Sequence, residues 1–261
     1  MLAERKTVIL DAGHGGPEPG AVYYGRQEKN DNLNLTMAVG NLLSQEGIHV
    51  LYTRVDDTYQ TPFEKAEIAN RSGADYFVSI HRNAMPVPNT ASGAETLVYE
   101  NSGVPALMAK NINAALEQAG FANLGVIERP GLIVLRRTQM PAVLVEAGFI
   151  DNEADNRFFD QNFEAIAQAI ARGIYETIQE EEEAVPAYYQ VQTGAYQNRN
   201  LADQQLTQLR SQGFPAFLVY DNGYYKVRAG AFLNMEYAAQ MEQRLREYGY
   251  NTVMVREKEV R

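Results

Sequence analysis

Two histidines and two glutamates stand in short polar stretches that lie far apart in the chain and whose side chains could bind and use a metal ion. His14 lies in DAGHGG, Glu28 in GRQEK, His81 in SIHRNA and Glu146 in VEAGFIDN. Two imidazoles and one carboxylate leave a coordination position of zinc open, as in catalytic sites, whereas structural sites fill every position. Glu146 would then be the base that acts on a metal-bound water.

Each of these side chains also has a structural interpretation when it is considered alone. His14 could cap a glycine-rich turn, His81 could be a hydrogen-bonded histidine at a strand end, and Glu28 could be a solvated loop carboxylate. Glu146 directly follows the apolar run 142–145, at the edge of a core where an unpaired carboxylate is costly to bury. Its partner could be a metal-bound water or a buried arginine. The candidate arginines are Arg82, Arg136 and Arg137.

The glycines around His14 could also suggest a phosphate-binding loop. Their spacing matches neither the dinucleotide-binding pattern nor the P-loop pattern, and no helix-like segment begins directly after them. We therefore give the phosphate interpretation little weight.

The composition is that of an ordinary globular protein without thiol chemistry. The chain has 261 residues, 45% hydrophobic and 21% charged, which suffices for one large or two smaller cores. Cysteine is absent, so histidines and carboxylates must hold any metal. The net charge of −10 argues against nucleic acid as the main partner. No stretch approaches the roughly 20 apolar residues of a membrane span.

Short apolar runs alternate with helix-like segments up to residue 178. The expected strands are 8–10, 50–53, 76–80, 94–99 and 142–145, and the expected helices are 32–46, 62–71, 104–119 and 163–178. This alternation predicts an α/β domain with a mostly parallel sheet flanked by helices. Sites in such sheets form at the carboxyl ends of strands. Because His14, His81 and Glu146 each follow an expected strand and Glu28 lies in an expected loop, we expect one shared site.

The C-terminal part of the chain is an internal duplication. YYQVQTGAY at 188–196 matches YYKVRAGAF at 224–232, and each copy continues with a helix-like run, a glycine and a short apolar strand. Two βαβ units predict a small ferredoxin-like α+β domain. The acidic run at 180–183 and the following proline suggest a linker. The predicted organisation is therefore a domain over 1–178, a linker over 179–187 and a second domain over 188–261.

The second domain has a small charge and many aromatic residues. Residues 188–261 carry nine Lys or Arg and seven Asp or Glu, a net charge of +2. Aromatic side chains alternate along the expected strands, so about half should face the core. The others could stack on sugar rings or, as in RNA-binding sheets, on bases. The small positive charge makes RNA the weaker of these two alternatives.

The four polar stretches, in this order and spacing, resemble those of the zinc-dependent N-acetylmuramoyl-L-alanine amidases of bacterial cell-wall lysis, over residues 7 to about 178. The resemblance implies that His14, Glu28 and His81 bind Zn²⁺ and that Glu146 is the catalytic acid/base. It implies hydrolysis, by zinc-activated water, of the amide between N-acetylmuramic acid and L-alanine. Residues 188–257 resemble the SPOR domain, which binds peptidoglycan, especially glycan strands stripped of stem peptides.

Two departures from the amidase pattern concern the substrate groove and regulation. Position 82 is arginine where the family often has a small residue, which we expect to affect the groove. No long insertion follows Glu95 of the kind that houses an autoinhibitory helix in division-type relatives. The arrangement, without a signal-peptide core, resembles amidases of spore formers that act when the mother cell lyses. We expect a monomer that is wall-associated or secreted, released from the mother-cell cytoplasm, and whose partners are glycan strands and stem peptides.

Two other classes of function remain open. One is a zinc peptidase that cuts within the stem peptide, and the other is a peptidoglycan-binding protein without catalytic activity. The complete set of four polar stretches argues against the second alternative. The bond that is broken in peptidoglycan separates the first alternative from the amidase.

Overall fold

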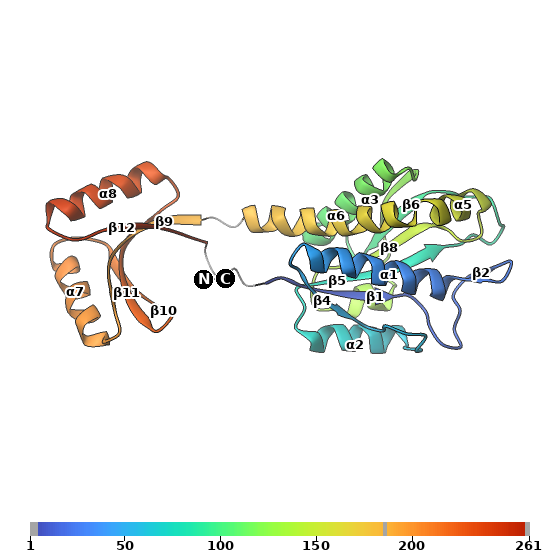
Figure 1. Cartoon of the computed structure of the whole chain (residues 1–261), viewed down its shortest axis with the longest axis horizontal. Helices are drawn as coiled ribbons and strands as arrows, with labels where there is room; N and C mark the ends of the chain where they lie inside the picture. The colour runs from blue at the N-terminus through green and yellow to red at the C-terminus, as the bar shows by residue number, and fades with distance from the viewer. Residues whose placement is uncertain (1–4, 185–186, 259–261) are drawn as a thin grey trace. The chain divides into compact units, whose positions relative to one another are not determined.

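The computed structural model describes residues 5–184 and 187–258. These residues form two compact units that divide between Glu181 and Glu182. Figure 1 shows the elements of each unit. The two units are described separately below.

The first unit is built on a mixed sheet with the order β4-β1-β5-β8-β6-β7. Its strands are β1 (Thr7–Ala12), β4 (His49–Tyr52), β5 (Tyr76–Asn83), β6 (Ala94–Val98), β7 (Asn123–Glu128) and β8 (Ala142–Phe149). β1 pairs in parallel with β4 and β5, and β5 with β8. β6 runs antiparallel to β8, while β7 is parallel to β6. The prediction of a mostly parallel sheet is confirmed, with β6 and β7 as a reversed edge.

Helices cover both faces of this sheet. One face packs against α1 (Glu28–Gln45), α3 (Gly103–Ala119) and α6 (Phe163–Ala184), and the other against α2 (Pro62–Ser72) and α4 (Ile133–Arg137) (Figure 1). Val8 and Leu10 of β1 belong to the first core, and Ile9 between them belongs to the second. Burial on both faces explains why the strands read as continuous apolar runs. A further helix, α5 (Glu153–Gln161), contacts β8.

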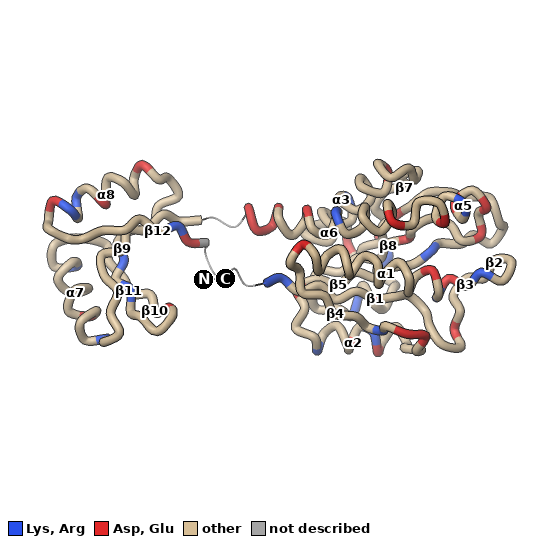
Figure 2. Tube along the Cα trace, viewed as in Figure 1, with Lys and Arg blue, Asp and Glu red and all other residues tan. Residues whose placement is uncertain are grey.

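The last helix of the first unit continues beyond its expected end. α6 runs past Ile178 to Ala184, so the acidic run at 180–183 is helical, and Figure 2 shows acidic residues at the C-terminal end of α6. Glutamate is a good helix former, which favours this extension over a linker. Tyr76 on β5 donates a hydrogen bond to Glu181 and ties the extension to the sheet. Residues 185 and 186 of the expected linker lie outside the described residues.

The second unit has the expected ferredoxin-like order. β9 (Ala187–Tyr196), β10 (Ala216–Asp221), β11 (Tyr224–Phe232) and β12 (Val253–Lys258) form an antiparallel sheet with the order β10-β11-β9-β12. α7 (Arg199–Ser211) and α8 (Met235–Glu247) pack on it around one core. Asn222 and Gly223 both have positive φ, as a tight hairpin between β10 and β11 requires.

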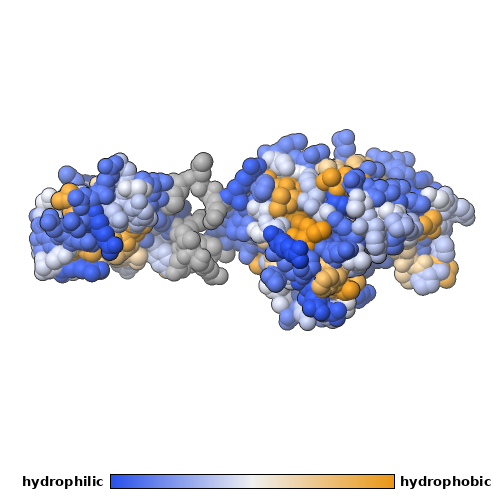
Figure 3. Space-filling model, turned by 90° about the horizontal axis from the view of Figure 1, so that it is seen from below, coloured by the Kyte–Doolittle hydropathy of each residue, from blue (hydrophilic) through white to orange (hydrophobic). Residues whose placement is uncertain are grey.

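On the face shown in Figure 3, hydrophobic side chains gather in separate patches within a mainly hydrophilic surface. No helix in residues 5–184 or 187–258 is both long enough and apolar enough to cross a bilayer.

Candidate metal centre and catalytic pocket

The loop after β1 brings His14 against His81 at the end of β5. His14 has a φ of +62°, and the two imidazole centroids lie 4.9 Å apart with the rings nearly perpendicular. A Cβ at Gly13 would lie 2.3 Å from Cε1 of His81, so only glycine allows this approach. The backbone N–H of Gly13 donates to the carbonyl of Ile80 at 3.0 Å, which joins the loop to β5.

A buried arginine holds the glycine loop through hydrogen bonds to its backbone carbonyls. Arg54 is 4% exposed and donates from Nε to the carbonyl of Ala12 at 3.0 Å and from Nη2 to that of Gly13 at 2.9 Å. A second Nη2 bond, also 2.9 Å, goes to the carbonyl of Lys29 in the first turn of α1. The loop that carries His14 and the helix that carries Glu28 are therefore fixed to one another.

Asp11, the first residue of the DAGHGG stretch, has a structural role. It is 1% exposed, and its Oδ1 lies 2.6 Å from Nζ of Lys65 on α2, which is also buried. Ser79 and Thr53 also donate to its carboxylate, each at 2.6 Å. Burial alone would raise the pKa of Asp11, but the charge of Lys65 and the three hydrogen bonds outweigh it and lower the pKa. The pair locks the end of β1 to α2.

Glu28 lies between the two imidazoles. Its Oε2 is 3.0 Å from Nε2 of His14 and its Oε1 is 2.9 Å from Nδ1 of His81. The expectation that Glu28 lies in a loop is wrong, because Glu28 is the first residue of α1 and is 4% exposed. Backbone N–H groups of Ala21 and Arg82 also donate to the carboxylate, at 2.9 and 3.1 Å.

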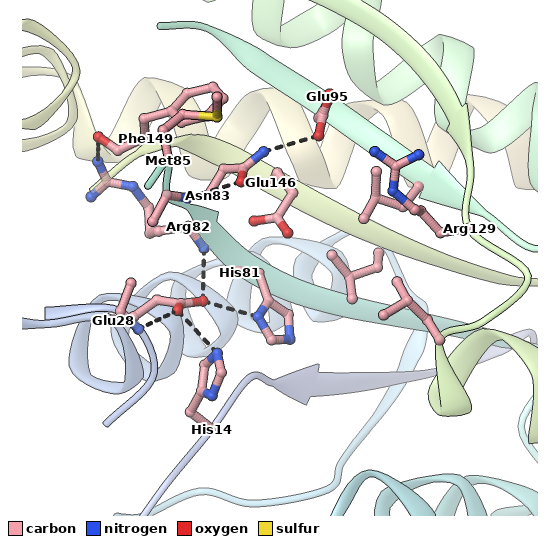
Figure 4. A pocket seen from close by; sticks show the side chains of 15 residues that line it. His14, Glu28, His81, Arg82, Asn83, Met85, Glu95, Arg129, Glu146 and Phe149 are labelled. Atoms are coloured by element: carbon pink, nitrogen blue, oxygen red, sulfur yellow. Dashed lines mark hydrogen bonds and ion pairs between the residues drawn. The ribbon is translucent and has the colours of Figure 1, made fainter. Parts of the chain in front are cut away.

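The three candidate ligands fit a zinc ion. One ligand atom from each of His14, Glu28 and His81 lies within 4.8 Å of the others, and Figure 4 shows them converging at one side of the pocket. Burial raises the pKa of Glu28, but its hydrogen bonds to both histidines outweigh burial and lower it strongly. Burial lowers the pKa of His14, while contacts with Glu28 and Glu18 outweigh this and raise it. An ionised carboxylate between two imidazoles is a donor set suited to zinc.

Glu18 orients His14 from the opposite side of the ring. Its carboxylate makes a short hydrogen bond with Nδ1 of His14 and accepts the backbone N–H of Gly20 at 3.1 Å. This contact leaves Nε2 of His14 facing Glu28. A carboxylate on the remote nitrogen of a histidine ligand commonly fixes the ring and its tautomer.

Glu146 enters the same pocket from β8. Its backbone lies opposite His81 on β5 and opposite Glu95 on β6, and in Figure 4 its carboxylate points toward His81 and Glu28. The Oε2 atom is buried and has no hydrogen-bond partner among the described residues. Burial, followed by the charges of Glu28 and Glu95, raises the pKa of Glu146 well above its ordinary value, and the charge of Arg82 only partly opposes them.

The structure pairs Glu146 with none of the arginines that the sequence offered. Arg136 and Arg137 are exposed on α4. Arg82 contributes to the lining of the pocket, but its guanidinium is buried and bonded elsewhere, to Asp31 at 2.8 Å and to the side-chain oxygen of Asn156 at 2.9 Å. The unusual arginine at position 82 therefore acts through the fold, since its charged group points away from Glu146 in Figure 4.

The pocket encloses about 550 Å³ and extends beyond the four predicted residues. Two of its charged residues, Glu95 and Arg129, were not predicted, because neither lies in a motif. Asn83 at the end of β5 donates from Nδ2 to Oε1 of Glu95 at 2.9 Å. The apolar lining of the pocket comes from several strands and loops, and includes Leu97, Leu132, Leu144 and Phe149.

The aromatic residues of the second unit divide between core and surface, as expected. Tyr196, Tyr225 and Phe232 pack against its hydrophobic core. Tyr224 is 39% exposed, and Tyr220 on β10, which was not among the aromatics expected in the duplicated strands, is 65% exposed.

Comparison with known proteins agrees with the geometry. Residues 8–176 match the family profile described as N-acetylmuramoyl-L-alanine amidase, and residues 185–257 match the SPOR domain. The catalytic domain of CwlV, an N-acetylmuramoyl-L-alanine amidase from Bacillus (Paenibacillus) polymyxa, superposes with a TM-score of 0.62 at 33% identity and covers 67% of this chain and 98% of that domain. An N-acetylmuramoyl-L-alanine amidase from Clostridium difficile 630 superposes with a TM-score of 0.64 at 32% identity, covering 68% of this chain and 98% of its own.

Relatives that extend over both units are also similar. The sporulation-specific N-acetylmuramoyl-L-alanine amidase of Bacillus subtilis (strain 168) is 30% identical over 218 residues, covering 81% of this chain and 84% of the relative. The amidase CwlM of Bacillus licheniformis is 33% identical over 219 residues, with 82% and 84% covered. The predicted family is thereby confirmed: the chain belongs to the N-acetylmuramoyl-L-alanine amidases and carries a SPOR domain after its amidase domain.

Proposed function

We propose that the chain hydrolyses the amide between N-acetylmuramic acid and L-alanine in peptidoglycan, with Glu146 as the acid/base and a zinc ion held by His14, Glu28 and His81. The observation that carries the proposal is the buried Oε2 of Glu146, which has no hydrogen-bond partner in the described part of the chain and shares a pocket with the three candidate ligands. A carboxylate without a protein partner needs a substrate, a water or a cation as its partner.

The two histidines and Glu28 provide the side of the pocket where a zinc ion would act as a Lewis acid. When bound there, zinc would lower the pKa of a water molecule and polarise the amide carbonyl. Glu18 holds the His14 ring with Nε2 turned inward. Arg54 and the backbone N–H groups of Ala21 and Arg82 keep the loop and the Glu28 carboxylate in place, so little reorganisation is needed when substrate arrives.

Glu146 carries the proton through the reaction. Its carboxylate accepts a proton from the attacking water while the water oxygen bonds to the carbonyl carbon of the lactyl group. The carbon–nitrogen bond then breaks, and Glu146 returns the proton to the nitrogen of L-alanine, which leaves as an amine. A pKa raised above that of an ordinary carboxyl group suits this double use, because it makes Glu146 a stronger base for the first step.

Analysis of digestion products tests the proposed bond. Purified sacculi treated with the enzyme should release stem peptides with a free L-alanine N-terminus and leave glycan with unsubstituted lactyl groups, both identified by mass spectrometry. A chelator should abolish the release, and added zinc should restore it. Products cut inside the stem peptide would instead show a zinc peptidase, and no products at all would show a binding protein.

We further propose that the second unit holds the enzyme on glycan strands and that the chain acts as a monomer, released from the mother cell in sporulation. The exposed Tyr220 and Tyr224 offer stacking faces for sugar rings. Binding to the polymer raises the local concentration of the catalytic unit. The sporulation-specific name of one relative supports the timing. Light scattering would check the monomer, and a fluorescent fusion followed through sporulation would check the release.

A further inference from the structure

One wall of the pocket carries a positive charge that the proposed reaction does not use. Arg129 directly follows β7, and its backbone N–H donates to the carbonyl of Val98 on β6 at 2.8 Å. Pro130 and Gly131 follow it. The residue is exposed and lines the same pocket as His14, Glu28 and Glu146. Figure 4 shows its side chain beyond Glu146, on the side away from Glu28.

The guanidinium of Arg129 has no anionic partner among the described residues. Its one hydrogen bond there runs from Nη1 to the carbonyl of Glu128 at 3.1 Å. The other arginine of the pocket differs, because the Arg82 guanidinium is buried and paired with Asp31. Within the described lining of the pocket, Arg129 is therefore the cation that is free to bind a ligand. Its planar fork of donors matches the geometry of a carboxylate.

The rest of the pocket decides where an anionic ligand would lie. Glu95 and Glu146 would repel a carboxylate placed next to them, so a ligand carboxylate can be accommodated only at the Arg129 side. The apolar side chains of Leu97, Leu132 and Leu144 also line the pocket. These features suit a ligand with an amide at the metal side, a short apolar segment, and a carboxylate at Arg129.

The chemistry of the substrate places that carboxylate on the peptide. The lactyl carboxyl group of N-acetylmuramic acid is consumed in the scissile amide, so the sugar side carries no free carboxylate. The stem peptide begins with the small apolar L-alanine, and its next residue, D-glutamate, continues the chain through the γ-carboxyl group. Its α-substituent is therefore either a free carboxylate or a neutral carboxamide.

We propose that Arg129 binds the α-carboxylate of the D-glutamate that follows L-alanine and makes the enzyme prefer the carboxylate form of the stem peptide over the carboxamide form. This inference rests on the proposed amidase function and assigns a specificity-determining residue to the same pocket. A charge-assisted bidentate contact in a partly enclosed pocket should give roughly a tenfold preference.

Two soluble substrates test the assignment. Both are N-acetylmuramoyl-L-alanyl-D-glutamate with the γ-carboxyl group capped as a methylamide, and they differ only in an α-carboxylate or an α-carboxamide. Wild-type enzyme should cleave the carboxylate form with a kcat/KM roughly ten times higher. Arg129→Gln should raise KM for that form by about the same factor and leave kcat, and both constants for the carboxamide form, nearly unchanged. Arg129→Lys should keep part of the preference.

Arg136→Gln is the matched control, because Arg136 is an exposed arginine on the adjacent α4 and does not line the pocket. It should leave the preference intact. Equal cleavage of both substrates by the wild type, or an equal effect of Arg129→Gln on both, would overturn the role of Arg129 while leaving the amidase function in place. A wild-type enzyme that cleaves neither lactyl–alanine bond would overturn the proposed function and this inference with it.

Discussion

Glu95 on β6 and Glu146 on β8 occupy directly opposed positions in the antiparallel pair at the reversed edge of the sheet. Like charges at opposed positions repel one another. The charge of Glu95 consequently helps burial and Glu28 to raise the pKa of Glu146. The reversal of β6 therefore places next to Glu146, the proposed acid/base, a charge that raises its pKa.

Glu95→Gln should move the acidic limb of the pH–rate profile to lower pH. Glu146 must be ionised to accept a proton, and its raised pKa delays ionisation as the pH rises. Removal of the neighbouring charge lowers that pKa, so the base form appears at lower pH, while glutamine still accepts the bond from Asn83. The kcat/KM profile measured against pH checks the direction. A limb that stays in place or moves upward would exclude the coupling.

Glu146→Gln should lower kcat by about 10²–10⁴, the usual range for loss of a general acid/base. The substitution keeps the shape of the side chain and changes a carboxylate whose Oε2 has no hydrogen-bond partner among the described residues, so the fold and the metal content should be retained. Turnover of a soluble muropeptide, with metal analysis of the same sample, measures both effects. Near-normal turnover would mean that another group handles the proton.

Gly20→Ala should weaken zinc binding. A Cβ at this position would lie 2.5 Å from Oε2 of Glu28 and 2.6 Å from Cδ2 of His14, so one of these side chains must move. The expected loss of affinity is roughly 10–100-fold, as for other changes around metal ligands. Titration of metal-free protein with zinc by calorimetry gives the value directly.

Gly25→Ala is the control for Gly20→Ala. Gly25 has a similarly positive φ of +83°, but its Cβ would meet nothing within 4 Å. The Gly25→Ala variant therefore has the backbone strain of Gly20→Ala without its contact with the candidate ligands. Equal loss of affinity in both variants would show that strain, and not displacement of Glu28 or His14, is responsible.

The Asp11–Lys65 pair should make the stability of the catalytic unit fall in acid. The folded-state pKa of Asp11 lies below its ordinary value of 3.8. Its contribution is therefore complete above that value and is lost as the pH falls through the folded-state pKa. Asp11→Asn should remove this part of the pH dependence and, at neutral pH, cost about 3–5 kcal/mol because Lys65 is left buried and unpaired. Urea denaturation between pH 2 and 7 measures the free energy of unfolding of both proteins. The same dependence on pH in the wild type and in Asp11→Asn would show that the pair is unimportant.

A chain that ends at Ala184 should keep its activity on soluble muropeptides and lose affinity for sacculi. The acidic end of α6 remains in this fragment, including the hydrogen bond between Tyr76 and Glu181. The separate fragment 187–261 should bind glycan stripped of stem peptides and should not bind RNA, since its small charge releases few counterions. Sedimentation with sacculi and an RNA gel shift at two salt concentrations measure both. Salt-dependent RNA binding without glycan binding would require another role for this domain.

Two of the candidate ligands could be located from the sequence because His14 follows β1 and His81 lies near the C-terminal end of β5, and parallel strands present these ends at one edge of the sheet. The position of Glu28 inside α1 could not be predicted, since the first turn of that helix is polar and lacks apolar periodicity. The end of α6 was missed for the same reason, because a run of glutamates favours a helix by propensity but gives no apolar face.

Contacts between distant parts of the chain carried no signal in the sequence. Glu95 stands alone in a short strand, and nothing in its neighbours indicates that β6 reverses direction and places it opposite Glu146. Lys65 lies in an ordinary helical segment, yet its ammonium group is buried against Asp11. Such pairings depend on strand order and helix packing, which local periodicity does not determine.

The buried guanidinium of Arg82 has a consequence for the order of folding. The candidate ligands all lie within residues 14–81, so a growing chain contains them long before it contains the C-terminal half of the domain. The backbone N–H of Arg82 holds Glu28, while its side chain is held by the carbonyl of Phe149 and by Asn156. Contacts between residues so far apart in the sequence form only when the two halves of the domain fold together. We therefore expect metal capture by the proposed site to be coupled to completion of the fold, and the rate of metal uptake during refolding would measure that last step.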